Sequence, residues 1–262
     1  MDILLFGTSI LIHRYFQIIK SDNDVNDYQI NSNTIGLTFS PTGCLFMYTH
    51  GIAAFLEDHF YLTNVIYAGN SGGCQASFFL ASGLGMNVAL NKWYLPMMDD
   101  IIKEDLKHPF LLTSFDKSKK YLRKLIDKDI LEKINNRYFT VITHFPYFIP
   151  IVNNNYKNFE ELFQIIKGTQ YIPFIFGWPF LIYKWRLICD GWLSCKIFKP
   201  VKNIKWLRID PFKWKRFKTM EGLTSFKNFH NVSYNLKLRD LGYQDAKNNI
   251  NEFIEIGLIP KK

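Results

Sequence analysis

The chain has 262 residues, of which 48% are hydrophobic and 17% aromatic, so one large core can form and a second domain is not needed. A net charge of +9 and a pI of about 9.2 favour a polyanionic partner, either nucleic acid or anionic lipid headgroups. The cysteines show neither a C-x-x-C pair nor metal-ligand spacing, which argues against a zinc site and, without a signal peptide, favours a reduced compartment.

Residues 1–32 read as an N-terminal segment of their own. Ile3 to Ile12 form an apolar stretch that is too short to span a bilayer and lacks the positive region and cleavage site of a signal peptide. Apolar residues continue at helical spacing to Ile19, which predicts a helix that lies on a membrane surface or, the preferred interpretation, packs on the domain. We expect an intracellular protein, cytoplasmic or peripherally membrane-associated.

A strand, a short loop and a helix follow this segment. Residues 34–39 read as a strand that enters Ser40-Pro41-Thr42-Gly43, and a helix continues through residues 45–55. Backbone amides of a loop at a helix N-terminus are suited to hold an oxyanion, and a simple capped turn explains the same residues.

The next element places a serine in a G-x-S-x-G frame, Gly69-Asn70-Ser71-Gly72-Gly73. Residues 61–68 before it are rich in β-branched and aromatic residues and predict a buried strand, while residues 75–84 predict a helix. A strand, a tight turn and a helix form the context of a nucleophile elbow, in which glycines permit the sharp turn and helix amides face the developing negative charge.

A third element lies well downstream, where an apolar strand at residues 187–189 runs into Asp190-Gly191-Trp192. Taken singly, an Asp-Gly pair after a strand is a turn whose carboxylate caps a backbone amide. The order of the loop, the serine elbow and the Asp-Gly step along the chain favours a functional role for Asp190 over a simple turn.

This order resembles the patatin-like phospholipase family, in which a glycine-rich oxyanion loop, a G-x-S-x-G serine and an Asp-Gly aspartate make a Ser-Asp dyad. Residues 159–166 followed by 171–174 resemble the family's segment before its aspartate. Residues 238–246 look like its closing G-Y-x-D-A helix. The likeness runs from about Asn33 to about Phe253.

The resemblance implies a three-layer α/β/α sandwich of the patatin type in a single domain, with residues 33–200 as the catalytic core and 201–262 completing it. It implies a lipid acyl hydrolase of the phospholipase A or acylglycerol lipase type, with Ser71 as nucleophile, Asp190 as base, and no metal or organic cofactor. A carboxylate is a weak base at its free pKa of about 4, so either burial has to raise the pKa of Asp190 or the geometry of the dyad has to compensate.

The oxyanion loop departs from the family pattern, because only Gly43 of the glycine-rich run is kept. Pro41 has no amide to donate and Thr42 resists a positive φ, which leaves the amides of Thr42, Gly43 and Cys44 as candidate donors. Trp192 stands where the family has a small residue, and we expect its ring to narrow the pocket or to shape it for a particular chain. A catalytically impaired lipid-binding protein is therefore the alternative function.

Two segments, one apolar and one basic, indicate which partners the protein binds. Residues 171–188 are expected to form the wall of an acyl-chain pocket. Residues 213–218 alternate cations with aromatics, which suits a membrane interface, single-stranded nucleic acid, or a surface loop whose aromatics pack into the core. We favour a lipid ester substrate at an anionic membrane or lipid-droplet surface. A basic nucleic-acid-binding protein is the more distant alternative.

A histidine mechanism is the main chemical rival. Ser71, Asp190 and His230 occur in the chain order of an α/β-hydrolase triad, but His230 lies in a polar connecting stretch. His50 is predicted to be a satisfied core residue. Neither histidine enters the predicted mechanism.

Overall fold

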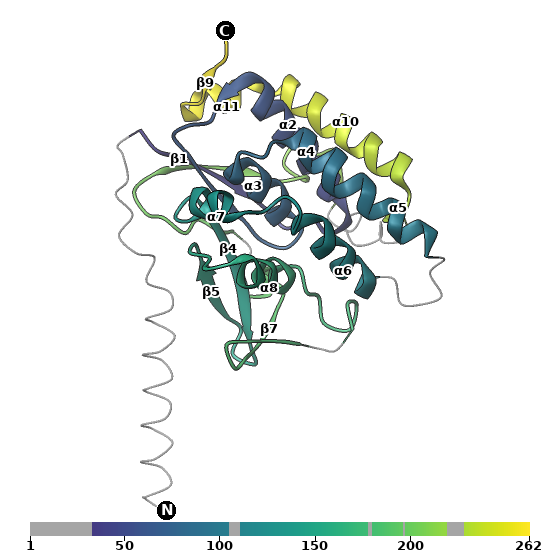
Figure 1. The fold of residues 1–262 in the computed structure, drawn as a ribbon. Coiled ribbons are helices and arrows are strands. Elements are labelled where there is room, and N and C mark those ends of the chain that lie inside the picture. The colour runs from purple at the N-terminus through teal and green to yellow at the C-terminus, as the bar shows by residue number, and fades with distance from the viewer. Residues whose placement is uncertain (1–32, 105–110, 178–179, 196, 219–227) are drawn as a thin grey trace, which may run out of the picture.

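The computed structural model describes residues 33–104, 111–177, 180–195, 197–218 and 228–262 (Figure 1). The N-terminal segment 1–32, with its predicted helix, lies outside these residues. Across the described ranges, no helix has the length and apolar content to cross a membrane.

A mixed sheet lies at the centre of the fold. Within the described residues its strands run in the order β6-β7-β4-β3-β1-β8, and β5 pairs with the other edge of β4. The four strands β4, β3, β1 and β8 are parallel, while β5, β6 and β7 are joined by antiparallel pairing. Their bounds are β1 (Ile35–Phe39), β3 (Val65–Gly69), β4 (Tyr138–Phe145), β5 (Ile149–Asn153), β6 (Leu181–Tyr183), β7 (Arg186–Cys189) and β8 (Lys205–Ile209). A separate two-stranded sheet joins β2 (Phe60–Tyr61) to β9 (Ile259–Pro260).

Helices cover one face of the central sheet (Figure 1). They are α2 (Phe46–His59), α3 (Gly73–Ser82), α4 (Met86–Val88), α5 (Leu95–Lys103), α6 (Leu111–Leu122), α7 (Lys128–Ile134), α8 (Phe159–Thr169), α10 (Val232–Asn248) and α11 (Ile250–Ile256). Short 3₁₀ turns, η1 (Gly43–Leu45) and η3 (Gly191–Leu193), and a π-helical turn, η2 (Ala89–Tyr94), complete the described elements. The α/β class is confirmed.

Helix α2 is buried between the sheet and α10. Its residues from Phe46 to Leu56 are all buried, which fits a helix that is apolar on every side. The backbones of α2 and α10 approach closely at two glycines: a Cβ at Gly51 would lie 1.9 Å from the Arg239 carbonyl oxygen, and one at Gly242 would lie 1.9 Å from that of Tyr48. This close contact fixes α10 over the helical layer.

The other face of the sheet carries a smaller core. Ile66 and Ala68 of β3 pack with Phe139 and Val141 of β4 beneath an irregular segment that contributes Phe198 and Val201. In the described residues, this segment between η3 and β8 supplies the cover of that face.

Turns and side-chain caps set where the strand before the elbow begins and where two of the helices end. The strand predicted at 61–68 begins only at Val65, after a turn. Helix α6 ends at Leu122, and α7 begins at Lys128, where the Asp127 side chain accepts a hydrogen bond from the Ile130 amide at 2.9 Å. Helix α10 ends at Asn248, and the Asn249 side chain donates to the Asp245 carbonyl at 2.7 Å.

Candidate active site

The serine elbow forms between β3, which ends at Gly69, and α3, which begins at Gly73. Ser71 has a φ of +49°, in the left-handed region that side chains rarely adopt. A Cβ at Gly73 would lie 2.4 Å from the Ser40 carbonyl oxygen, and one at Gly69 would lie 2.2 Å from Ser77 Oγ. The turn is therefore possible only with glycines on both sides of the serine.

Asp190 reaches Ser71 because β3 and β7 both pair with β4. Gly69 pairs with Thr140 of β4 in parallel, whereas Cys189 pairs with Thr143 of β4 in antiparallel. The two strands run toward each other, so their carboxyl ends face one another across a short stretch of β4. Neither strand pairs with the other in the described sheet.

Ser71 and Asp190 are joined directly. Ser71 Oγ donates a hydrogen bond to Asp190 Oδ2 at 2.8 Å, and Asp190 Oδ1 accepts one from the Trp192 amide at 2.8 Å. The backbone of Asp190 is fixed as well, since its amide donates to the Tyr171 carbonyl at 2.8 Å and its carbonyl accepts from Thr143 Oγ1 at 2.6 Å. The carboxylate is thus held in one orientation toward the serine.

Both side chains are buried, with Ser71 6% and Asp190 2% exposed. Burial raises the pKa of Asp190 from 3.8 to about 7, and the hydrogen bonds from the Trp192 amide and the Ser71 hydroxyl oppose this rise. A carboxylate with this pKa is about half ionised at neutral pH, and its basicity suits general base catalysis there.

Gly191 is required by the same close packing. A Cβ at this position would lie 2.2 Å from the Val141 carbonyl oxygen and 3.1 Å from Thr169 Oγ1. The glycine lets η3 turn directly over β4, which keeps the Trp192 amide against the carboxylate.

The loop before α2 lies against the elbow. Thr42 has a φ of −118° and Gly43 one of +53°, so the positive φ falls on the glycine and the expected conflict at Thr42 does not arise. A Cβ at Gly72 would lie 2.2 Å from Thr42 Oγ1 and 3.5 Å from the Gly43 amide nitrogen. Gly72 therefore leaves the space in which this loop sits.

A cavity of about 60 Å³ begins at Ser71. Gly43, Cys44 and Gly72 line its polar end beside the serine. Its walls are mainly aromatic and aliphatic, and include Phe46, Trp93, Met97, Phe115, Phe176 and Phe229. Asp190 is not among the lining residues and lies behind the serine.

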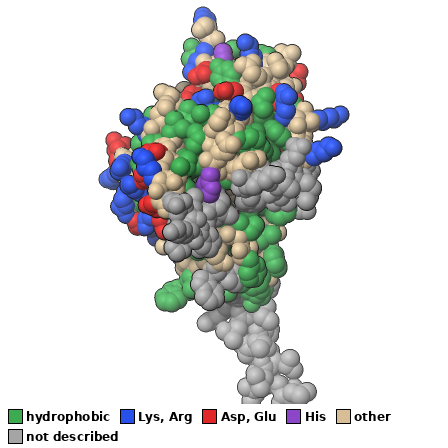
Figure 2. All heavy atoms as spheres, turned by 90° about the vertical axis from the view of Figure 1, so that its right-hand side faces the viewer, with side chains coloured by type: hydrophobic (Ala, Val, Ile, Leu, Met, Phe, Trp, Pro, Cys, Tyr) green, Lys and Arg blue, Asp and Glu red, His purple; other side chains and the backbone are tan. Residues whose placement is uncertain are grey.

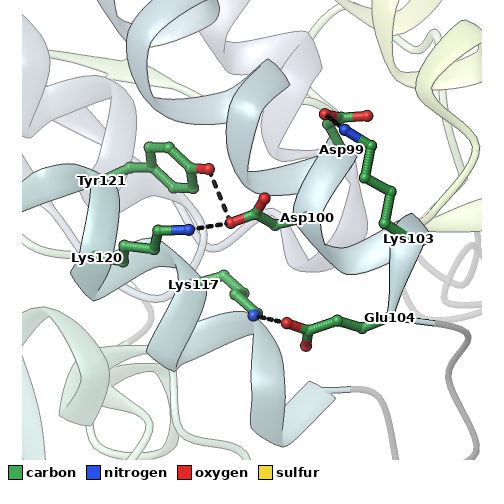
Figure 3. Close-up of polar contacts among 7 residues, drawn as sticks. All are labelled: Asp99, Asp100, Lys103, Glu104, Lys117, Lys120 and Tyr121. Atoms are coloured by element: carbon green, nitrogen blue, oxygen red, sulfur yellow. Dashed lines mark hydrogen bonds and ion pairs between the residues drawn. The ribbon is translucent and has the colours of Figure 1, made fainter.

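Helix α6 covers part of this cavity and is fastened to α5 by polar contacts (Figure 3). Asp100 accepts hydrogen bonds from Lys120 at 2.5 Å and from the Tyr121 hydroxyl at 2.8 Å, and Lys117 pairs with Glu104. Lys120 and Glu104 are exposed, while Asp100 and Lys117 are partly exposed, so salt screens the ion pairs in part.

Trp192 and the segment 171–188 differ from their predicted roles. Trp192 is 45% exposed and is not a cavity-lining residue, so the prediction that its ring narrows or shapes the pocket is wrong. Among the described residues of 171–188, only Ile172 and Phe176 line the cavity, while Trp185 is 99% exposed.

The histidines take no part in the Ser71–Asp190 contact, because the serine donates directly to the carboxylate. His50 is buried and stacks on Trp93 with ring centroids 5.9 Å apart, and burial lowers its pKa to about 3. It lies in the core as predicted, but its Nε2 has no hydrogen-bond partner in the described structure, so it is not satisfied.

The basic segment 213–218 is a surface loop whose aromatic side chains pack against the core, which is the third of the three interpretations considered for it. Trp214 Nε1 donates to Glu252 at 3.1 Å, and the Phe217 ring packs edge-on against Tyr48 at 5.1 Å. Arg216 binds the Asp245 carboxylate through two nitrogens. These aromatics anchor a surface loop to the helical layer.

Sequence reasoning missed several residues around the dyad. Thr169 Oγ1 accepts a hydrogen bond from the Ser71 amide at 3.1 Å, and Thr143 holds the Asp190 backbone. Single threonines carry no motif. The apolar face of α6 is visible as a periodic pattern, but the pattern does not reveal that Phe115 faces the serine cavity.

The fold and site together define an α/β protein with a buried serine–carboxylate pair behind a mainly apolar cavity. No protein-family model and no curated protein matches the chain. Among solved structures, the chain is similar to the crystal structure of VipD from Legionella pneumophila, with a TM-score of 0.45 and 12% identity, over 68% of this chain and 50% of that chain. The match thus spans about half the length of VipD.

Proposed function

We propose that this protein is a serine-dependent lipid acyl hydrolase in which Ser71 is the nucleophile and Asp190 is the general base. The observation that carries the proposal is the 2.8 Å hydrogen bond from Ser71 Oγ, on a left-handed elbow, to a carboxylate that is 2% exposed. Its raised pKa supports the role of Asp190 as a base near neutral pH.

The reaction follows from this arrangement. Ser71 Oγ attacks the ester carbonyl carbon while Asp190 Oδ2 accepts the hydroxyl proton, and the carbonyl oxygen becomes an oxyanion. The tetrahedral intermediate collapses, the ester bond breaks, and Asp190 returns its proton to the leaving alcohol. Water then attacks the acyl-enzyme, gives a proton to Asp190, and releases the fatty acid as Ser71 recovers its proton.

The amides of Thr42, Gly43 and Cys44 are the proposed oxyanion donors. Gly43 and Cys44 line the cavity beside Ser71, which supports this role. Pro41 supplies no amide, and losing one donor typically costs about 10² to 10³ in kcat. We therefore expect slow turnover. A lipid-binding protein without turnover is the alternative outcome of the test.

The apolar walls of the cavity support the acyl side of an ester as the group bound next to Ser71, and a volume of about 60 Å³ holds only the part of the chain nearest the carbonyl. Phe115, Met97 and Phe176 offer an apolar surface, while Gln75 and Gln170, joined at 2.7 Å, place polar groups at the same cavity. This combination suits an ester with an apolar acyl part and a polar alcohol part, such as a phospholipid or an acylglycerol.

The test compares hydrolysis of phospholipid vesicles and of a short-chain nitrophenyl ester by the wild type, Ser71→Ala and Ser77→Ala. Ser77 is a matched control, since it is a buried serine of α3 whose hydroxyl donates to the Gly73 carbonyl at 3.0 Å. We expect a loss of at least about 10³-fold in Ser71→Ala alone. Equal rates in Ser71→Ala and the wild type would contradict the proposal.

A further inference from the structure

Large apolar side chains are exposed on the β4–β5 turn, on the β6–β7 hairpin and on the loop after α8, and the two turns lie at the lower end of the sheet in Figure 1. We call these residues the apolar rim. Figure 2, turned about the vertical axis, also shows hydrophobic side chains on the surface toward this end. The rim consists of Tyr147, Phe148, Phe174, Ile182 and Trp185, which are 58%, 51%, 81%, 70% and 99% exposed.

Strand register brings the two turns together. Phe145 of β4 pairs with Leu187 of β7, so the β4–β5 turn that follows Phe145 and the β6–β7 turn that precedes Arg186 project from the same end of the sheet. The ring of Phe145 also stacks on Phe180, just before β6, with centroids 3.9 Å apart. The rim residues of the two turns are therefore exposed to solvent at the same end of the sheet.

The backbone at the rim is strained. Phe148, Phe174 and Trp185 have φ values of +53°, +66° and +63°. Two-residue hairpin turns with positive φ usually contain glycine, asparagine or aspartate, which adopt this conformation at less cost. Here bulky aromatics bear the strain and are also left in water, so folding alone does not explain their presence.

The rim continues into the wall of the cavity. Ile172 and Phe176 line the cavity, and Phe176 packs on Phe115 of α6 with ring centroids 5.0 Å apart. Phe174, between them in the chain, points outward. One short loop thus contributes to both the cavity wall and the rim.

The charge around Trp185 indicates what the rim contacts. Lys184 and Arg186 flank it in the chain, and the Lys184 side chain is 60% exposed. The acidic group beside them is Glu161, which pairs with Lys184 at 3.0 Å. Aromatic rings flanked by cations are typical of segments that sit at headgroup depth in an anionic membrane, and the chain as a whole carries +9.

We propose that the apolar rim inserts into the headgroup region of an anionic phospholipid bilayer and places the cavity wall at 172–176 against the lipid. This proposal specifies where the proposed hydrolase meets its lipid substrate, and it rests on the proposed function for the reason why the protein binds lipid. The binding itself needs neither Ser71 nor Asp190. A rim that binds a protein partner would not need a bilayer, so binding to lipid vesicles distinguishes the two kinds of partner.

The test is flotation of the full chain with vesicles of phosphatidylcholine and phosphatidylglycerol, or of phosphatidylcholine alone. We expect the wild type and Ser71→Ala to bind the anionic vesicles equally, and Trp185→Ser and Phe174→Ser each to weaken binding by about tenfold. Tyr61→Ser is the matched control, because Tyr61 is an aromatic 50% exposed on β2, outside the rim, and should bind as the wild type does.

A second measurement locates Trp185 itself. Brominated lipid in the vesicles should quench part of the tryptophan fluorescence of the wild type, and Trp185→Phe should keep binding but lose most of that quenching. Wild-type protein that does not float, rim variants that bind as tightly as the wild type, or binding without preference for anionic lipid would overturn the proposal. Because neither readout involves turnover, a rim that binds vesicles in a protein without hydrolase activity would refute the proposed function and leave the rim standing.

Discussion

Replacing Asp190 by asparagine should remove activity and at the same time stabilise the protein. Asparagine keeps the size of the side chain, and its carbonyl oxygen can still accept from the Trp192 amide that Asp190 binds at 2.8 Å. It carries no charge, so the cost of burying an ionised carboxylate disappears. Ser71 would lose its base.

The magnitude follows from the pKa. Burial raises the pKa of Asp190 from 3.8 to about 7, and about 3 units at 1.36 kcal/mol each correspond to about 4 kcal/mol. Between these two pH values the folded protein binds more protons at this site than the unfolded chain, so the stability of the wild type falls as pH rises. The penalty is complete above about pH 7 and absent below about pH 4.

The assay is thermal and urea unfolding of the wild type and Asp190→Asn at acidic, neutral and alkaline pH. We expect the melting temperature of the variant to exceed that of the wild type by about 10 °C at alkaline pH, with the difference closing toward pH 4. A variant that is no more stable than the wild type at alkaline pH would refute the reasoning.

Asp245→Asn is the control of opposite sign. Hydrogen bonds from Arg216 hold the pKa of Asp245 below its usual value, so ionised Asp245 stabilises the folded state above that value. This contribution is lost as pH falls through the folded-state pKa. Asp245→Asn should therefore destabilise the protein at neutral pH, and the difference should shrink in acid.

Three further changes have distinct expected outcomes. Gly191→Ala should lower the free energy of unfolding by about 1 to 3 kcal/mol in urea, because its Cβ meets the Val141 carbonyl oxygen at 2.2 Å; an unchanged midpoint would show that η3 can shift. Thr169→Val should cost about 1 to 3 kcal/mol by removing the acceptor of the buried Ser71 amide, and a neutral effect in the same assay would count against that role. Asp100→Asn should lower the melting temperature at low salt and lose most of this effect at about 1 M salt, whereas a salt-independent effect would argue against an ion-pair origin.

The local part of the site could be predicted because its determinants are adjacent in the sequence. The elbow requires glycines at fixed offsets from Ser71, and residues 69–73 show them directly. The approach of Asp190 to Ser71 is different, since the two lie 119 residues apart and meet only because β3 and β7 face each other along β4. Only the family resemblance indicated that contact. The catalytic roles of both residues stay a prediction.

The features that sequence reasoning did not predict depend on packing between distant elements. The direction of the Trp192 ring after the Asp-Gly step is not set by its neighbours, and the residue is 45% exposed. Likewise, the aromatics at 214 and 217 are partly buried against α11 and α2, which an isolated basic segment cannot reveal. Part of the apolar rim was hidden within the apolar run 171–188, because the alternation between Phe176 inside and Phe174 outside depends on the turn.

The central claim is that Ser71 is an activated nucleophile with Asp190 as its base. A lipid-like fluorophosphonate tests it most directly, with the adduct located by mass spectrometry in the wild type, Ser71→Ala, Asp190→Asn and Ser77→Ala. The account predicts an adduct on Ser71, none in Ser71→Ala, a slowed reaction in Asp190→Asn, and wild-type labelling in Ser77→Ala. A folded wild-type protein that carries no adduct on Ser71 would contradict the account and leave a lipid-binding protein without hydrolase chemistry.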